Sequence, residues 1–136
     1  MKNLVVFLSS QKDGGLLLFR VIAGIIFVLH GWAKFNGGFA IGFFTKIGMP
    51  IPSVSGPFIT ALEIGGGVAL ILGLLTRYLG ILYTIQMCVA AYVQWILFKK
   101  GFSGAELELL LVFTGILMAT HGAGEFSLDR MLKLER

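Results

Sequence analysis

The sequence predicts an all-α polytopic membrane protein, an antiparallel bundle of four transmembrane helices with a short interfacial helix between the first two. The chain is 57% hydrophobic and only 13% charged, whereas soluble domains carry about 25% charged residues. Its apolar runs are long, and each crossing of a bilayer needs about 20 helical residues. Four crossings use about 80 residues and fit a chain of 136 residues, so we expect residues 1–136 to form one membrane domain.

Long apolar runs bounded by glycine, proline and charged residues define the spans. We expect spans at about 16–35, 57–75, 78–98 and 105–122. Pro57 suits the first turn of the second span. Residues 39–47 place Phe and Ile side chains on one helical face and predict the short interfacial helix. We also expect a tight turn at Thr76-Arg77 and a short amphipathic helix after Ser127, a preferred N-cap residue.

The distribution of charge predicts an orientation and excludes some functions. Four antiparallel spans place both termini on one side, with six Lys and Arg residues outside the spans there against four on the other side. The positive-inside rule therefore favours both termini in the cytoplasm. The net charge of +4 does not indicate nucleic-acid binding, because the cations form no basic cluster. The single cysteine, Cys88, excludes an internal disulfide or a C-x-x-C redox motif.

Ionisable side chains inside the spans are the informative residues, because an Arg or Asp at a helix centre costs about 2.5–3.5 kcal/mol. Glu63 lies about 9 Å from the non-cytoplasmic end of the second span, at 1.5 Å per residue. Four more polar side chains share this layer: His30, Lys34, Gln94 and Glu108. Arg20 and His121 belong to the opposite half. Glu63 and Glu108 lie on helical faces with small residues, which turn toward neighbouring helices. We therefore expect a buried polar cluster in which the two acids meet cationic or donor partners.

Each of these side chains also has an ordinary structural explanation. Lys34 and Arg20 could extend their charged ends to the membrane surface, and Arg20 could instead cap the end of the second span. Gln86 and Gln94 could form hydrogen bonds between helices. His30 has no second histidine at a ligand spacing, so no metal site is predicted. The deep carboxylate of the second span has the strongest functional indication, because it needs a partner or a proton.

Six short motifs follow one another along the chain: Arg20; His30-Gly31 with Lys34; Pro50-x-Pro52; Glu63-x-x-Gly66-Gly67; Gly73-x-x-Thr76-Arg77; and Gly122-x-Gly124-x-x-Ser127-Leu128-Asp129. In this order they resemble the DoxX family of small bacterial membrane proteins, over about residues 16–132. Ala123 stands where many relatives have proline, which should affect only the exit from the fourth span. The resemblance implies a four-helix protein of the bacterial cytoplasmic (inner) membrane.

The resemblance also implies a redox neighbourhood. Some relatives are membrane subunits of thiosulfate:quinone oxidoreductase, and others work beside superoxide dismutase and a sulfurtransferase or beside dioxygenases. The matched polar positions that would carry function are Arg20, His30, Lys34 and Glu63. Glu108 comes from the burial argument alone.

We therefore expect a membrane subunit of a redox or oxidative-stress system that binds a quinone or similar amphiphile among its helices, rather than a stand-alone enzyme. The expected catalytic residues are Glu63, His30 and Lys34, and the expected ligand-binding residues are Arg20, Gln94 and Glu108. No flavin, haem or iron–sulfur motif is visible, so electrons would come from a soluble partner protein, and a homodimer is compatible with the glycine-rich faces. Two alternatives stay open: a non-catalytic membrane anchor or assembly factor, and a small-solute or proton pathway.

Overall fold

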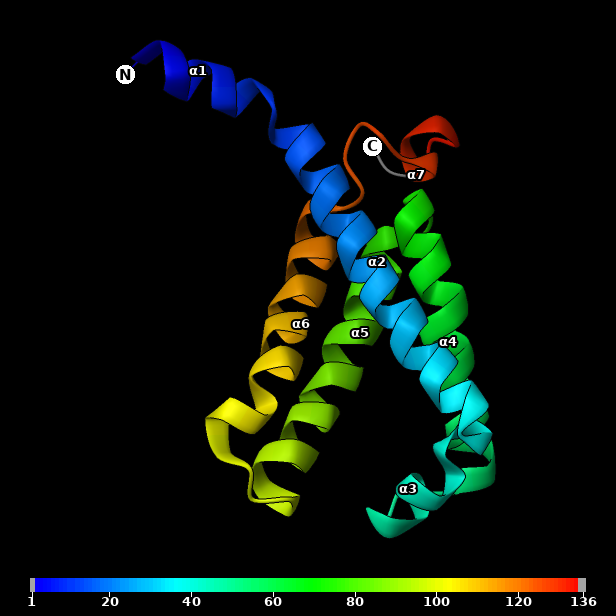
Figure 1. Ribbon diagram of the computed structural model, residues 1–136. Helices are drawn as coiled ribbons and strands as arrows, with labels where there is room; N and C mark the ends of the chain where they lie inside the picture. Colours follow the sequence, from blue (N-terminus) through cyan, green and yellow to red (C-terminus); the bar gives the residue numbers. More distant parts are fainter. Residues whose placement is uncertain (1, 135–136) are drawn as a thin grey trace.

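The computed structural model describes residues 2–134, and this part of the chain contains helices and no strand. Four helical segments are long and apolar enough to cross a membrane (Figure 1). They are α2 (Lys12–Asn36), α4 (Pro52–Leu72), α5 (Thr76–Tyr92) with its continuation η2 (Val93–Leu97), and α6 (Gly101–His121). The predicted all-α fold with four spans is therefore confirmed.

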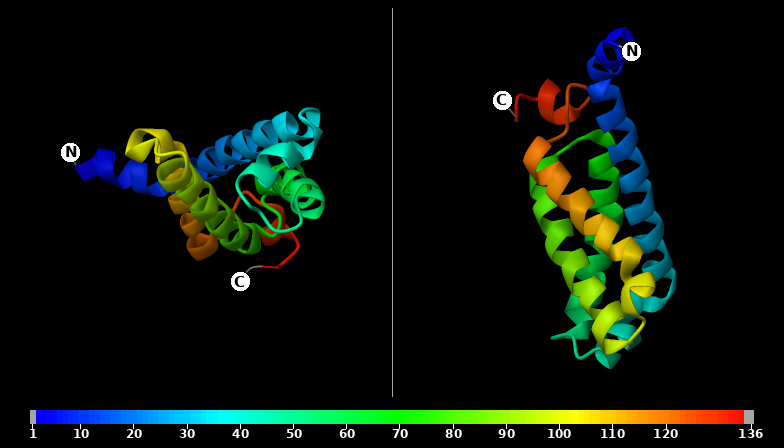
Figure 2. Two further views of the ribbon diagram at one scale, coloured as in Figure 1. Left: turned by 90° about the horizontal axis from the view of Figure 1, so that it is seen from below. Right: turned by 90° about the vertical axis from the view of Figure 1, so that its left-hand side faces the viewer.

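The four spans form two closely packed pairs, α2 with α4 and α5 with α6, and contacts between the pairs are much fewer. In Figure 1 the pairs lie close together near the chain termini and separate toward α3 (Ile41–Lys46). The side view in Figure 2 shows both termini at one end and, at the other, α3 and the connection between α5 and α6. This up-and-down arrangement matches the predicted antiparallel topology.

Glycines allow the close approach within each pair. A Cβ atom on Gly24 of α2 would lie 2.6 Å from the carbonyl oxygen of Gly67 on α4, and a Cβ on Gly67 would lie 2.8 Å from the carbonyl oxygen of Gly24. In the second pair, a Cβ on Gly80 would lie 2.7 Å from the carbonyl oxygen of Gly115. These separations are too short for any residue with a side chain. The small-residue faces therefore turn inward, as their position predicts.

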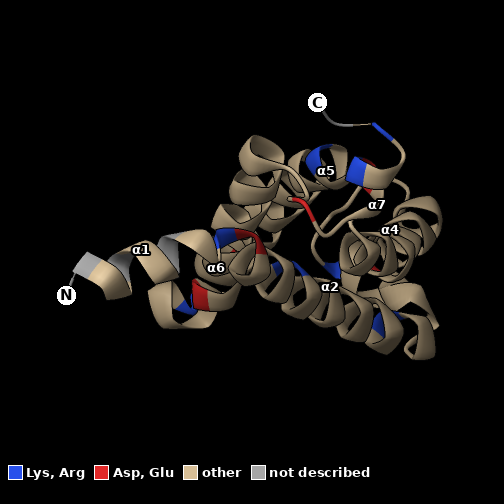
Figure 3. Ribbon diagram, turned by 90° about the horizontal axis from the view of Figure 1, so that it is seen from above, with Lys and Arg blue, Asp and Glu red and all other residues tan. Residues whose placement is uncertain are grey.

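Polar contacts join the helices and the C-terminal segment at the end of the bundle that carries the termini. The buried guanidinium of Arg20 donates to the backbone carbonyls of Ala123, Phe126 (2.8 Å) and Ile71 (3.4 Å). The Asp129 carboxylate accepts hydrogen bonds from the backbone N–H groups of Leu75 (2.7 Å) and Thr76 (2.9 Å). These bonds tie the C-terminal segment to α2 and to the connection between α4 and α5. Seen from this end, charged residues occupy a few positions on a largely uncharged bundle (Figure 3).

The short helices agree in part with the sequence predictions. The predicted interfacial helix is η1 (Gly38–Ala40) followed by α3, which packs against α4. Ser127 caps α7 (Leu128–Met131), and its hydroxyl accepts from the Arg130 N–H at 3.2 Å. Helix α1 (Lys2–Ser10) was not predicted. It extends away from the bundle in Figure 1 and has few contacts with the rest of the chain beyond the start of α2.

Two predicted boundaries were wrong. The second span begins at Pro52, and Pro57 lies inside α4 rather than in its first turn, because the earlier proline already takes the N-terminal position that suits this residue. The turn before the third span lies at residues 73–75, and Thr76 begins α5. Gly73 has a φ of +70°, a conformation that favours glycine, and the Asp129 carboxylate holds the first N–H groups of α5.

Candidate functional site

A pocket of about 480 Å³ lies between the two helix pairs, on the side of the bundle where they separate. Its walls are mainly apolar side chains from α3, α4, α5 and α6. All five polar side chains predicted to share one layer line it: His30, Lys34, Glu63, Gln94 and Glu108. The pocket therefore brings these five side chains to one space, and Gln86 joins the same lining.

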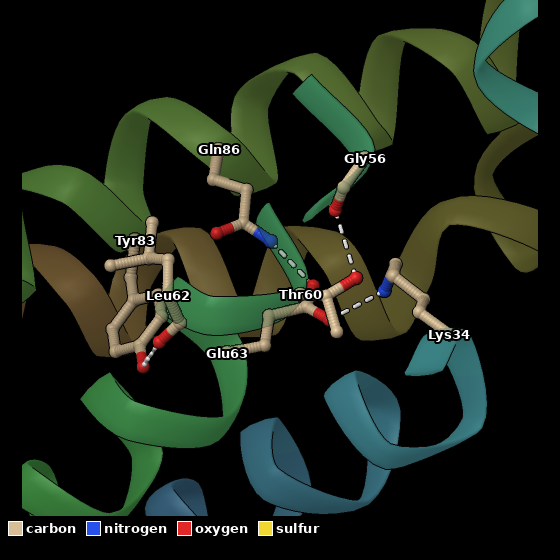
Figure 4. Close-up of polar contacts among 7 residues, drawn as sticks. All are labelled: Lys34, Gly56, Thr60, Leu62, Glu63, Tyr83 and Gln86. Carbon is tan, nitrogen blue, oxygen red and sulfur yellow. Dashed lines mark hydrogen bonds and ion pairs between the residues drawn. The ribbon is translucent and has the colours of Figure 1, made fainter. Parts of the chain in front are cut away.

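Glu63 is the centre of the polar groups in the pocket. Its side chain is 1% exposed, and Oε2 lies 2.6 Å from Nζ of Lys34, which is 23% exposed. Its other oxygen, Oε1, accepts a hydrogen bond of 2.5 Å from Nε2 of Gln86 (Figure 4). The carboxylate therefore has a cation on one oxygen and an amide donor on the other, which is the pairing that a buried charge requires. Of the two acids predicted to meet cationic or donor partners, Glu63 does so, and Glu108 lines the same cavity.

The helix packing explains why Lys34 and Glu63 meet. A Cβ on Gly31 would lie 2.9 Å from Cβ of Glu63, so only glycine lets α2 pass this close to α4. Lys34 follows Gly31 by three residues and therefore lies on the same face of α2. Thr60, one turn before Glu63, donates to the carbonyl of Gly56 on its own helix at 2.8 Å and takes no part in the cluster (Figure 4).

An aromatic layer separates the pocket from the end of the bundle that carries the chain termini. The rings of Phe27 on α2 and Tyr83 on α5 stack with centroids 3.6 Å apart and planes at 9°. The Tyr83 hydroxyl donates to the carbonyl of Leu62 at 3.0 Å. Leu70 and Met118 are buried in the same core cluster. Apolar side chains thus fill the interior between the Glu63 cluster and Arg20.

The structure does not bring Arg20 to the pocket. Its guanidinium lies at the opposite end of the bundle, and one of its bonds goes to Ile71 at the end of α4, which supports the capping alternative. His30 lines the pocket with an exposed side chain. Among residues 2–134, no group of three His, Cys, Asp or Glu side chains is placed to hold a metal ion.

Sequence reasoning missed the direct role of Gln86 as a partner of Glu63. It was interpreted as a residue for hydrogen bonding between helices, with a bond to a ligand as the alternative, and the bond between helices is present, since it joins α5 to α4. The available signal was that Gln86 shares the inward-facing stripe of α5 with buried Tyr83 and Leu79. The apolar wall supplied by Phe43 and Phe44 of α3 was also missed, because it depends on how α3 folds back over α4.

The fold and the pocket define a polytopic α-helical membrane protein with a buried, charge-paired cluster facing an apolar cavity. A protein-family model described as DoxX matches residues 15–96. This match covers more than half of the chain, so the protein belongs to the DoxX family.

Named relatives agree with this assignment. The chain is 41% identical over 124 residues to the Bacillus subtilis (strain 168) protein named "Putative oxidoreductase CatD", covering 90% of each chain. It is 29% identical over 127 residues to "Inner membrane protein YqjF" of Escherichia coli (strain K12), covering 92% of this chain and 97% of the relative. It is 28% identical over 130 residues to "Inner membrane protein YphA" of the same organism, covering 85% and 88%. No solved structure matches the chain.

Proposed function

We propose that this protein is the membrane subunit of a redox system and that its pocket binds a quinone or a similar amphiphile. The observation that carries the proposal is the paired carboxylate of Glu63 at the wall of a mainly apolar cavity. Ligand pockets of about 300–1,000 Å³ with a few convergent polar groups accept drug-sized molecules. The cavity of about 480 Å³ is in this range, so its size and lining fit a ring head group.

The residues of the pocket have separate roles in this proposal. A bound quinone would supply the redox chemistry, because its ring accepts electrons together with protons. Lys34 and His30 donate hydrogen bonds toward a ring oxygen. Glu63 holds and exchanges the accompanying proton at its carboxylate. Gln94 and Glu108 orient the part of the head group nearer α6.

The redox setting is supported by the name of one relative, "Putative oxidoreductase CatD". Cys88 is the only cysteine, so we propose that electrons reach the pocket from a soluble partner protein, and a second copy of the chain could complete the assembly. The cation count favours termini in the cytoplasm. This orientation places the pocket in the outer half of the membrane.

The two other functions make different use of the same cluster. A proton or solute pathway needs a polar route through the bundle, and the stacked rings of Phe27 and Tyr83 lie across that route. A membrane anchor needs the Lys34–Glu63 pair only to join α2 to α4. The anchor function is therefore the alternative that an experiment must separate from ligand binding.

Filling the pocket with a larger side chain and measuring ligand binding is the direct test. Ala90 lines the pocket, whereas Ala61 lies on the exposed face of α4, so Ala90→Phe and Ala61→Phe add the same bulk at matched sites. Protein in lipid nanodiscs is titrated with decylubiquinone, and quenching of tryptophan fluorescence is measured against empty discs. We expect Ala90→Phe to weaken binding at least tenfold and Ala61→Phe to change it less than twofold.

The role of Glu63 is tested in the complex purified with its partner. Glu63→Gln should abolish quinone-dependent turnover while partner recovery and thermal stability stay near those of the wild type. If Glu63→Gln lowers partner recovery and thermal stability together, and decylubiquinone binds neither the wild type nor this variant, the anchor function replaces the redox proposal.

A further inference from the structure

Two lysines at the end of the bundle that carries α3 meet around one aromatic ring. Nζ of Lys46, in the last turn of α3, lies 5.8 Å from the ring centroid of Phe98. Nζ of Lys100, in the connection between α5 and α6, lies 5.7 Å from the same centroid. The ring of Phe98 also contacts that of Phe43 on α3, with centroids 6.0 Å apart. These contacts link α3 to the second helix pair at the end where the two pairs separate (Figure 1).

The lysines at this end of the bundle have no carboxylate partner in the part of the chain that the structure describes. Lys46, Lys100 and the neighbouring Lys99 are exposed, and none of them forms an ion pair among residues 2–134. The two acids in the first half of α6, Glu106 and Glu108, are not paired with them either. Like charges repel each other, so the gathering of unpaired cations indicates an anion that comes from outside the chain.

The helix dipole explains only one of the two lysines at the ring. A cation stabilises a helix near its C-terminal end, which is where Lys46 lies in α3. Lys100 occupies the N-cap position of α6 and makes no cap hydrogen bond with its side chain. This is the positive end of the helix dipole, where a cation is unfavourable. An anion bound beside Lys100 would offset both positive charges.

Exposed aromatic side chains place these lysines at the surface of the membrane. Trp32 near the end of α2, Tyr92 at the end of α5 and Trp95 in η2 have exposed fractions of 54%, 55% and 41%. Trp and Tyr side chains gather at the level of the lipid head groups. Trp95 also contacts the ring of Phe102, which follows Lys100 by two residues, with centroids 5.9 Å apart. The lysines therefore lie at the depth of the lipid phosphates.

We propose that Lys46 and Lys100 bind the phosphate of an anionic phospholipid, whose head group joins α3 to the connection between α5 and α6. Lysine binds phosphate as a point charge on a flexible stem, so both side chains can turn from the ring of Phe98 toward one phosphodiester. A phospholipid also brings acyl chains, which cover exposed apolar side chains just below the lysines, such as Ile96 and Leu97. Soluble phosphate has no such chains.

This lipid site goes beyond the proposed function and does not depend on it. The Lys34–Glu63 pair lies inside the pocket, whereas the lipid site is made by exposed lysines at the end of the bundle. Phe43 and Phe44 of α3 nevertheless line the pocket. A phospholipid that holds α3 against the connection between α5 and α6 therefore also keeps this wall of the pocket in place.

Quenching of a single tryptophan by brominated lipids tests the site. The chain has two tryptophans, so Trp32→Phe leaves Trp95, three residues before Phe98, as the only reporter. This protein is reconstituted in phosphatidylcholine with increasing fractions of dibrominated phosphatidylglycerol or, separately, dibrominated phosphatidylcholine. The two quenching curves give the binding constant of one lipid relative to the other. We expect phosphatidylglycerol to bind at least fivefold more tightly.

Two double variants in the same Trp32→Phe background locate the preference. Lys46→Gln/Lys100→Gln removes both charges at the ring and should reduce the preference for phosphatidylglycerol to less than twofold. Lys12→Gln/Lys133→Gln is the matched control, because it removes two exposed cations from the opposite end of the bundle. This control should keep the preference at fivefold or more.

The other outcomes overturn the proposal. Equal binding of the two lipids by the Trp32→Phe protein, or a preference that survives in Lys46→Gln/Lys100→Gln, shows that these lysines bind no phospholipid. An equal loss in both double variants shows an effect of net charge alone. Inorganic phosphate at constant ionic strength should not change the quenching, and if it abolishes the preference, the lysines bind soluble phosphate instead. Binding of decylubiquinone is measured separately, so the failure of either proposal is recognised on its own.

Discussion

Replacement of Lys34 by methionine should destabilise the protein by leaving the Glu63 carboxylate without its cation. Removing one partner of a fully buried ion pair costs about 3–5 kcal/mol. The side chain of Glu63 is 1% exposed and that of Lys34 is 23% exposed, so the ammonium loses less hydration than in a fully buried pair. We therefore expect Lys34→Met to lower the free energy of unfolding by about 2–3 kcal/mol, less than a fully buried pair would lose.

The double variant Lys34→Met/Glu63→Gln supplies the control. Replacing both members of a buried pair by neutral groups of similar shape is often neutral or stabilising, and glutamine can still accept from Gln86. The double variant should therefore recover at least half of the stability lost in Lys34→Met. The free energy of unfolding is measured by circular dichroism as dodecyl maltoside micelles are titrated with SDS. If Lys34→Met is within 0.5 kcal/mol of the wild type, roughly the range of surface substitutions, the pair is not the buried interaction described here.

Three further substitutions test the packing of α2 against α4 and the polar contacts at the end of the bundle that carries the chain termini. Gly67→Ala should lower the free energy of unfolding by about 1–3 kcal/mol through overpacking, because its Cβ would lie 2.8 Å from the Gly24 carbonyl oxygen. Gly65→Ala is the control, since its Cβ would have nothing within 4 Å, and it should change the midpoint of the SDS titration little. Equal effects of the two variants would contradict the assigned contact face of α4. Asp129→Ala should cost about 1–2 kcal/mol, as loss of a helix cap does, and exposed Glu125→Ala serves as its reference in thermal unfolding. Arg20→Met should expose residues 122–127 to limited proteolysis and change the affinity for decylubiquinone less than twofold. A tenfold loss of affinity would show that Arg20 takes part in ligand binding.

The sequence was sufficient to predict the spans and the polar layer, because charged residues are rare in this chain and their depth follows from the helical rise. Glu63, Lys34 and Glu108 could be assigned to one level without coordinates, since the spans alternate in direction. Their small-residue faces also indicated which sides turn inward. What these signals share is that each depends on a single helix and its position in the membrane.

The partners within the layer could not be predicted in the same way. The bond from Gln86 to Glu63 depends on how far α5 is rotated relative to α4, and the packing of Tyr83 against Phe27 sets that rotation. Arg20 shared the inward stripe of α2 with Lys34, but the loop after α6 folds back to meet it. Such long-range contacts leave no periodic signal along the chain.

The matched family motifs fall into two groups in space. One group meets around the connection between α4 and α5: Arg20 donates to the Ile71 carbonyl, the Asp129 carboxylate accepts from the backbone N–H of Thr76, and the Gly73 carbonyl accepts from the backbone N–H of Asp129. His30, Lys34 and Glu63 line the pocket at the other end. The motifs of this chain therefore include both residues that stabilise the fold and residues that line the pocket, and only the coordinates separate the two kinds.

The unequal joining of the two helix pairs has a mechanical consequence. Hydrogen bonds join the pairs near Arg20 and Asp129 and again where Gln86 and Tyr83 of α5 bond α4, whereas beside α3 the contact is made by Phe43 against the ring of Phe98. A rotation of one pair against the other about these bonded stretches displaces the residues beside α3 most. The width of the cavity is therefore the dimension of this molecule that changes with the least disturbance of its core.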